Sequence, residues 1–143
     1  MTPRFGIHPD DQALADAITR FAQAELAPHA HEVDEAALST VRYVPALAEL
    51  GVMGMNLPEA WGGPGATPTA LVLSLAAIAE ACASTASMIG AHYLATDSVL
   101  IGGDDAMRAR YLPGAADGRL LGAFALTELD WGSFSTPLAA IAD

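Results

Sequence analysis

Apolar residues recur at steps of three and four positions near the start of the chain, which is the spacing of one face of an α-helix. Leu14, Ile18 and Phe21 follow this spacing, and two aspartates precede them, where the helix dipole favours negative charge. The pattern predicts an amphipathic helix over about residues 10–26. Pro28 should end or kink it.

The segment from His29 to Glu35 (HAHEVDE) crowds imidazoles and carboxylates together, which is the residue chemistry of a metal site. Residues two apart do not share a helix face, and nothing else in the sequence completes a ligand set. We therefore expect a solvated acidic turn at this segment, and no metal.

A second helix is predicted over about residues 39–50. Pro45 stands inside it, either at the first helical position or at a bend, and Gly51 is well placed as the C-terminal cap. The apolar residues that follow predict a buried connector. Residues 56–65 have the glycine and proline density of a loop, which Trp61 is expected to anchor.

Two nearly uncharged helices are predicted in the middle of the chain. Thr67 and Pro68 form a helix start, with the hydroxyl as cap and the proline in the first turn. A second helix follows over about residues 85–101. The first is apolar nearly all round, and the second has small residues on one face and bulky apolar residues elsewhere. Because both nearly lack charge, we expect them to be the most buried helices of the fold. A shorter helix should begin at Asp104 and end at Tyr111, because a proline follows soon after.

The stretch from Leu120 to Ser133 (LLGAFALTELDWGS) changes from an apolar run to a polar loop. Its first half is apolar at successive positions, which is typical of a strand buried on both faces. Thr127 and Glu128 then bring a hydroxyl and a carboxylate, and Gly132 frees the backbone. A buried strand that opens into such a loop is a common way to present polar groups to a cofactor. The plain alternative is the first strand of a small sheet, followed by a turn.

Composition narrows the classes of function. The chain of 143 residues is 52% hydrophobic and 16% charged, so part of its surface is expected to be covered by another domain or subunit. Its net charge of −11 argues against binding to nucleic acid. All six basic residues are arginines, which excludes Schiff-base chemistry and a P-loop lysine.

The same sequence bears on localisation. The single cysteine, Cys82, fits a reducing compartment, and residues 1–11 lack the apolar core of a signal peptide. The uncharged stretches are better explained by core helices than by membrane spans. We expect a cytoplasmic protein without a membrane span.

Five segments, in this order and spacing, resemble the acyl-CoA dehydrogenases. They are LADAITRFAQAELAPHA, LAELGVMGMNLPEAWGGPG, ACASTAS, RARYLPGAADGRLLGAFALTE and the Gly132-Ser133 pair. The resemblance implies a mainly α fold: the N-terminal helical bundle of that family over residues 1–119, followed over residues 120–143 by the first strand of a truncated middle β-domain.

The resemblance also implies a chemistry. The family uses FAD to desaturate an acyl thioester between its α and β carbons, as in fatty acid metabolism. A carboxylate removes the α-proton while the β-hydrogen passes as hydride to the flavin. The implied substrate is an acyl-CoA or acyl-carrier thioester. The implied assembly is a homo-oligomer or a complex with a second acyl-CoA dehydrogenase-like subunit.

Site residues are carried over from the same resemblance. Phe124, Leu126 and Thr127 would be the first flavin-contacting stretch, with Thr127 at the pyrimidine edge of the ring. Gly132 and Ser133 would meet the pyrophosphate, and Ser133 would also lie beside the CoA arm. The residues that would line the acyl pocket, on the helix over 85–101, are Ser87, Met88 and His92.

His92 has a second interpretation from its setting alone. A lone histidine in an apolar helix is more often a satisfied core residue than a catalytic one.

The sequence departs from the family pattern at several points. Leu129 stands where the family usually has proline, and Phe134 where an acid usually follows the serine. The glutamate base of the family has no counterpart among these 143 residues. Glu128 and Asp130 cannot take its role, because the family places its base on a different domain. We therefore expect no catalytic residue in this chain, and no activity without further domains or a partner subunit.

Two alternatives stay open at this point. One is a flavin monooxygenase or oxidase on the same fold. The other is a non-catalytic helical module that uses its apolar face for a partner. Leu129 and Phe134 slightly favour the module, whereas the intact FALTE sequence favours a flavin role.

Overall fold

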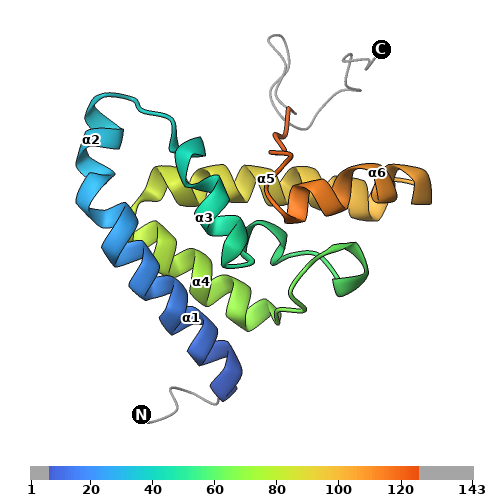
Figure 1. The fold of residues 1–143 in the computed structure, drawn as a ribbon, viewed down its shortest axis with the longest axis horizontal. Helices are drawn as coiled ribbons and strands as arrows, with labels where there is room; N and C mark the ends of the chain where they lie inside the picture. Colours follow the sequence, from blue (N-terminus) through green and yellow to red (C-terminus); the bar gives the residue numbers. More distant parts are fainter. Residues whose placement is uncertain (1–6, 126–143) are drawn as a thin grey trace, which may run out of the picture.

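Two long helices meet at Cys82 and form the centre of the fold (Figure 1). The computed structural model describes residues 7–125, and its longest helices are α4 (Pro68–Ala81) and α5 (Ala83–Gly102). Thr67 caps α4, since its Oγ1 accepts the N–H of Ala70 at 3.1 Å, as predicted. The extended backbone of Cys82 (φ −155°, ψ 101°) then breaks the helix and lets α5 leave in a new direction.

The first helix, α1 (Pro9–Phe21), packs along α4 (Figure 1). It continues as a π-helical turn, η1 (Ala22–Leu26), so the predicted helix over residues 10–26 is confirmed. Pro28 explains the wider turn, because in a regular α-helix its ring would clash with the carbonyl of Ala24.

After η1 the chain forms a 3-10 turn, η2 (Ala27–His29), and a short helix, α2 (Ala30–Glu35). The expected acidic turn is therefore wrong in conformation, although the histidines and carboxylates of the segment are exposed and only Val33 is buried. Helical spacing brings His31 within 3.4 Å of Glu35, four residues later, which favours the helix when the imidazole is charged. Within residues 7–125, no group of three or more metal-ligating side chains comes together.

The predicted second helix forms in two parts, the 3-10 turn η3 (Thr40–Tyr43) and α3 (Val44–Glu49). Pro45 lies in the first turn of α3, which is one of the two placements that the sequence allowed. Gly51 ends this helix in the left-handed conformation (φ +74°), so its role as the C-terminal cap is confirmed.

The connector η4 (Val52–Gly54) is a buried 3-10 turn, as predicted, with its valine and methionine fully covered. The loop that follows contains a further 3-10 turn, η5 (Glu59–Trp61). Trp61 packs against the buried cluster of Leu57, Leu112 and Ala116, so its role as the anchor of the loop is confirmed.

The last helix, α6 (Asp105–Ala116), lies beside the C-terminal half of α5 (Figure 1). The predicted end at Tyr111 is wrong, because α6 continues through Pro113. The missing N–H of Pro113 does not end the helix, since Leu112 is fully buried and the Pro113 carbonyl still accepts the N–H of Asp117 at 3.2 Å.

The chain leaves α6 as a non-helical segment that extends to residue 125. The strand predicted from Leu120 does not form in this segment, because a strand needs backbone groups of a second strand, and residues 7–125 contain none. The remainder of the predicted strand and its polar loop lie outside the described residues. The mainly α fold class is confirmed.

The core lies where α1, α3 and η4 meet the inner sides of α4 and α5. Ile78 of α4 and Ile89 of α5 are fully buried, and Leu75 is half-buried, as expected for the central helices. Both helices also carry apolar side chains that the described part of the chain leaves uncovered. Val72 is 62% exposed and Ile101 is 80% exposed.

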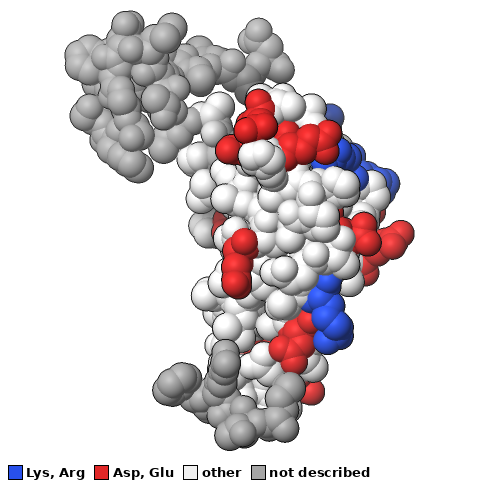
Figure 2. All heavy atoms as spheres, turned by 90° about the vertical axis from the view of Figure 1, so that its left-hand side faces the viewer, with Lys and Arg blue, Asp and Glu red and all other residues white. Residues whose placement is uncertain are grey.

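Charge is unevenly distributed over the surface. In Figure 2 the carboxylates are scattered over the visible face, the arginines lie along one edge, and much of the remaining surface is neutral. Among the helices within residues 7–125, none has the length and apolar character needed to cross a membrane.

Candidate functional site

One face of α5 is open to solvent and carries neutral side chains. Ser87 is exposed, Leu94 is 53% exposed, and a Cβ added to Gly90 would find nothing within 4 Å. These three positions share one side of the helix because they follow its three- and four-residue repeat. We call them the open face of α5. Its small and apolar residues make a surface suited to an apolar chain.

The three residues predicted for the acyl pocket do not share this face. Ser87 lies on it. Met88 is half-buried, and its sulfur accepts the hydroxyl of Thr40 at 3.4 Å. His92 has no exposed surface. Each residue turns the helix by about 100°, so positions 88 and 92 point toward the interior when position 87 points outward.

His92 is a buried histidine whose two ring nitrogens are both engaged. Its Nε2 lies 3.0 Å from the carbonyl oxygen of Met53, and its Nδ1 accepts the N–H of Gly122 at 2.9 Å. A carbonyl can only accept and an amide N–H can only donate, so this geometry assigns a neutral ring with its proton on Nε2. The interpretation as a satisfied core histidine is confirmed.

Burial explains why this ring stays neutral. It lowers the pKa of His92 from the ordinary value of 6.5, and the backbone carbonyls of Met53 and Ala115 oppose this shift without reversing it. The neutral ring is the form that its two partners require.

Two further contacts tie α5 to the region of η4. Tyr93 donates its phenol hydrogen to the carbonyl of Val52, and burial raises the pKa of this phenol well above its usual value. Asn56 donates its side-chain amide to the hydroxyl of Thr96 at 2.9 Å and to the carboxylate of Asp97 at 2.7 Å. The middle of α5 is therefore held in register with the buried connector.

Gly122 lies closer to α5 than a residue with a Cβ could. A Cβ at this position would stand 2.7 Å from the Cβ of Ala95 and 3.3 Å from the carbonyl oxygen of His92. No role was predicted for this glycine from the sequence. Its signal is an isolated glycine inside an apolar, strand-like run, which often marks a close approach of two backbones.

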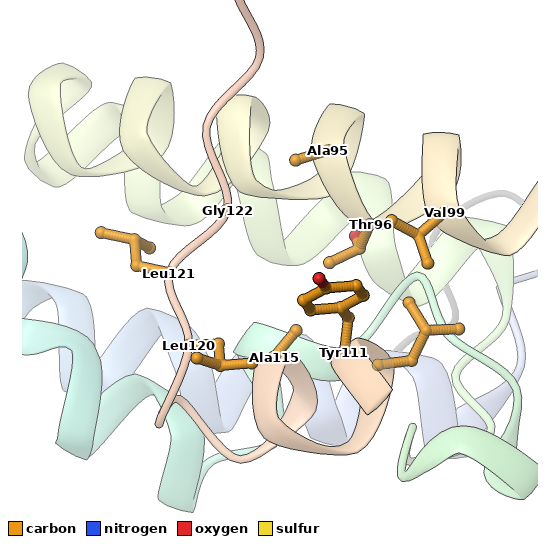
Figure 3. A pocket seen from close by; sticks show the side chains of 9 residues that line it. Ala95, Thr96, Val99, Tyr111, Ala115, Leu120, Leu121 and Gly122 are labelled. Atoms are coloured by element: carbon orange, nitrogen blue, oxygen red, sulfur yellow. The ribbon is translucent and has the colours of Figure 1, made fainter. Parts of the chain in front are cut away.

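A shallow apolar cavity of about 290 Å³ lies beside this contact (Figure 3). Its walls include Ala95 and Val99 of α5, Tyr111 of α6, and Leu121 and Gly122 of the segment that follows. Figure 3 shows this segment running past both helices. The cavity is therefore an apolar space between α5, α6 and the segment that follows α6.

Phe124 is the one predicted flavin contact that lies among the described residues. Its side chain is 44% exposed. The other four predicted contacts lie outside the described residues, and their roles remain predictions; they are Leu126, Thr127, Gly132 and Ser133.

The described residues fit one edge of a flavin site. A flavin ring needs apolar contacts, and Phe124 and Leu121 expose apolar surface in the segment that Gly122 holds against α5. The pyrophosphate needs hydrogen-bond donors, and the residues predicted to provide them, Gly132 and Ser133, lie outside the described residues.

Comparisons with known proteins agree on one family. A sequence model described as the N-terminal domain of acyl-CoA dehydrogenase matches residues 8–119. The acryloyl-CoA reductase (NADH) of Anaerotignum propionicum is 30% identical over 129 residues, which cover 90% of this chain and 33% of that protein. The (2S)-methylsuccinyl-CoA dehydrogenase of Cereibacter sphaeroides is 34% identical over 131 residues, which cover 90% of this chain and 24% of that protein.

A solved structure shows the same architecture. The acyl-CoA dehydrogenase of Bacillus anthracis, complexed with FAD, superposes with a TM-score of 0.78 at 28% identity. The superposition covers 92% of this chain and 23% of that one.

The family match covers most of the sequence, so the chain belongs to the acyl-CoA dehydrogenase family. Its helices correspond to the N-terminal domain of that family, as the resemblance predicted, and FAD is a cofactor of the family. The chain spans 33% and 24% of the length of the two curated relatives named above.

Proposed function

We propose that this chain forms the N-terminal domain of a flavin-dependent enzyme that desaturates an acyl thioester between its α and β carbons. The observation that supports this most strongly is the packing of Gly122 on Ala95, one residue from Leu94. The chain that follows α6 thus passes beside the open face of α5. A predicted flavin-contacting stretch beside a neutral surface suits a substrate with an apolar chain.

In this proposal residues 1–119 are the helical domain and residues 120–143 begin the middle β-domain. The flavin ring would be contacted by Phe124, Leu126 and Thr127, and the pyrophosphate by Gly132 and Ser133. A bound flavin would supply the acceptor for the β-hydrogen. The residues of this chain would hold and orient the reactants, and would keep water from the reacting carbons.

The open face of α5 would line the acyl pocket. Ser87 would contact the substrate, while Met88 and His92 would support the same helix from its inner side. The relatives from Anaerotignum and Cereibacter are both named for CoA thioesters, which supports a CoA thioester as the substrate class here.

The base that removes the α-proton would come from outside these 143 residues. It would be supplied by a further part of the same polypeptide, by a second acyl-CoA dehydrogenase-like subunit, or within a homo-oligomer. Glu128 and Asp130 are not proposed for this role, because in the family pattern they lie at the flavin edge and not across the substrate from it.

A chimera tests the proposal. Residues 1–143 would replace the matching first segment of an active acyl-CoA dehydrogenase, and the unmodified enzyme would serve as control. We expect the purified chimera to retain FAD, and its visible flavin absorbance to bleach when an acyl-CoA is added without an electron acceptor. A folded chimera that loses FAD, or that keeps FAD without any bleaching by short-, medium- or long-chain acyl-CoA, would overturn the proposal.

A non-catalytic helical module is the second candidate. Its supporting observation is the exposure of Val72 and Ile101, which leaves an apolar surface on the two central helices. In that case the chimera would fold without retaining FAD.

A further inference from the structure

The segment after α6 first bonds back to that helix, where the N–H of Leu120 donates to the carbonyl of Gly114 at 2.8 Å. Beyond that point, the structure describes one hydrogen bond between residues 121–125 and the rest of residues 7–125. In this bond the N–H of Gly122 donates to Nδ1 of His92 at 2.9 Å. The segment next passes through Phe124, the first of the proposed flavin contacts. The position of that contact therefore depends on where Gly122 is held.

The hydrogen bond between His92 and Gly122 requires a neutral imidazole. On one side of the ring the carbonyl of Met53 requires a donor, and on the other side the N–H of Gly122 requires an acceptor. The ring is fully buried, so a nitrogen that lost its partner would stay unsatisfied. One ring thus joins the connector η4 to the segment after α6, across 39 and 30 residues of sequence.

The close approach of Gly122 fixes the geometry further. Its missing Cβ is what allows the backbone to lie against Ala95 and beside Nδ1 of His92. Histidine and glycine act as a pair here, one by its acceptor nitrogen and one by its lack of a side chain.

We propose that His92 is a positioning residue: its neutral ring holds Gly122 against α5 and so sets the start of the flavin-contacting stretch, a role that rests on the function proposed above for that stretch. The ring acts through Gly122 and touches neither cofactor nor substrate. Protonation of Nδ1 would turn the acceptor into a donor that faces another donor, and the segment would be released.

The groups around the ring determine the pH at which His92 would take up a proton. η4 contributes the Met53 carbonyl, α6 the Ala115 carbonyl, and the segment after α6 the Gly122 N–H. On α5 the ring of Tyr93 lies 6.2 Å away, centroid to centroid, and Asp97 acts on that phenol. The shift in the pKa of His92 has no contribution from a charged side chain among the described residues, so burial controls it.

Two substitutions separate the two hydrogen bonds of the ring. In His92→Asn the side-chain oxygen can take the place of Nδ1 and accept the N–H of Gly122, while the donor to Met53 is lost. In His92→Gln the side-chain amide can reach the place of Nε2 and donate to Met53, while the acceptor for Gly122 is lost. Each variant removes the titrating ring and keeps one bond, so they control for each other.

The measurement is amide hydrogen exchange by NMR on the 143-residue chain without FAD. At about pH 7, we expect His92→Gln to lower the protection of the Gly122 amide about tenfold, as for the loss of one buried hydrogen bond, and His92→Asn to preserve it. The amides of Ile78 and Ile89 should remain equally protected in all three proteins. Loss of protection across α4 and α5 in both variants would mean a structural role only, and would overturn the proposal.

Acid gives an independent readout. Between about pH 7 and about pH 5, the wild-type chain should lose protection at Gly122 after correction for the intrinsic exchange rate, whereas His92→Asn should keep it. An equal loss in both proteins, or none in either, would overturn the proposal. In the wild type the 15N shift of Nδ1 should change together with the protection of Gly122.

FAD titration then separates this inference from the proposed function. With FAD as the probe, His92→Gln should bind more weakly than His92→Asn, in the chain or in the chimera. FAD binding that is equal in the two variants would overturn the positioning role. Failure of the chimera with wild-type His92 to retain FAD would count against the proposed function, while the exchange experiment would still decide how Gly122 is held.

Discussion

The side-chain amide of Asn56 lies 2.7 Å from the carboxylate of Asp97, a residue 41 positions later in the sequence. The same amide donates to the hydroxyl of Thr96 at 2.9 Å. These bonds join the loop after η4 to the middle of α5, next to the turn where His92 and Tyr93 bind the connector. The contact therefore helps to hold the register of the helix that carries the proposed acyl pocket.

Asn56→Asp should destabilise the chain by about 1–3 kcal/mol, because it replaces a donor by a carboxylate that faces the carboxylate of Asp97. The double variant Asn56→Asp with Asp97→Asn exchanges donor and acceptor, and should recover most of the loss. Urea denaturation at neutral pH measures both effects. A double variant no more stable than the single one would show that this contact does not act as a hydrogen-bonded pair.

The burial of α4 can be tested with two substitutions on the same helix. Ile78→Ala removes a fully buried side chain and should cost about 2–5 kcal/mol of unfolding free energy. Val72→Ala, at a site 62% exposed, should change it by less than about 0.5 kcal/mol. Similar losses at the two positions, measured by chemical denaturation, would contradict the assignment of the inner and outer sides of α4.

The stability of the chain should fall in weak acid because of His92. Its pKa is lowered by burial, so below about pH 6.5 the unfolded chain takes up a proton that the folded chain resists. The contribution is fully present above pH 6.5 and decreases by up to about 1.4 kcal/mol per pH unit as the pH falls toward the lower folded-state pKa. His92→Asn, which keeps the other three histidines, should reduce the slope of unfolding free energy against pH in this range. An unchanged slope would mean that another group carries the dependence.

The uncovered apolar surface should drive self-association of the isolated chain. We expect light scattering at micromolar concentration to detect dimers or larger species, because Val72 and Ile101 expose apolar surface on the central helices. Ile101→Lys should shift the distribution toward the monomer. Glu80→Gln, at an exposed site on α4, changes the net charge by the same amount and serves as the control for charge. A clean wild-type monomer that binds no hydrophobic dye would contradict this expectation.

The 143-residue chain by itself should not dehydrogenate acyl-CoA. Removal of the α-proton needs a base within about 3 Å in the bound pose, and the proposed base lies outside these residues. The assay combines the chain with FAD, an artificial electron acceptor and acyl-CoAs of short, medium and long chain. Turnover abolished by Glu128→Gln or Asp130→Asn would place the base within this sequence after all, whereas turnover that survives both would point to a different base.

Much of the helical framework follows from local signals, since a helix start needs only neighbours a few residues away. Thr67 with Pro68 and the acidic start of α1 act within one turn of backbone, and they predicted these starts correctly. The same holds for Gly51, whose left-handed conformation depends on its own lack of a side chain. The family resemblance added the order of these elements.

Local signals failed where distant packing outweighs them. Pro113 should end a helix, yet α6 continues because buried Leu112 holds the last turn in place. The strand predicted from Leu120 needs a partner strand that residues 7–125 do not provide. In both cases the deciding contact lies outside the window in which sequence patterns act.

The sequence by itself determined most of the helix starts and the family, and it supplied the candidate residues for a flavin and a thioester. Only the tertiary structure separated Ser87, on the open face, from Met88 and His92, which point inward. It also decided the partners of His92, because Met53 and Gly122 lie 39 and 30 residues away and meet the ring through packing alone. Helix propensity and periodicity are properties of neighbouring residues, whereas a hydrogen bond across such distances exists only once the core has assembled.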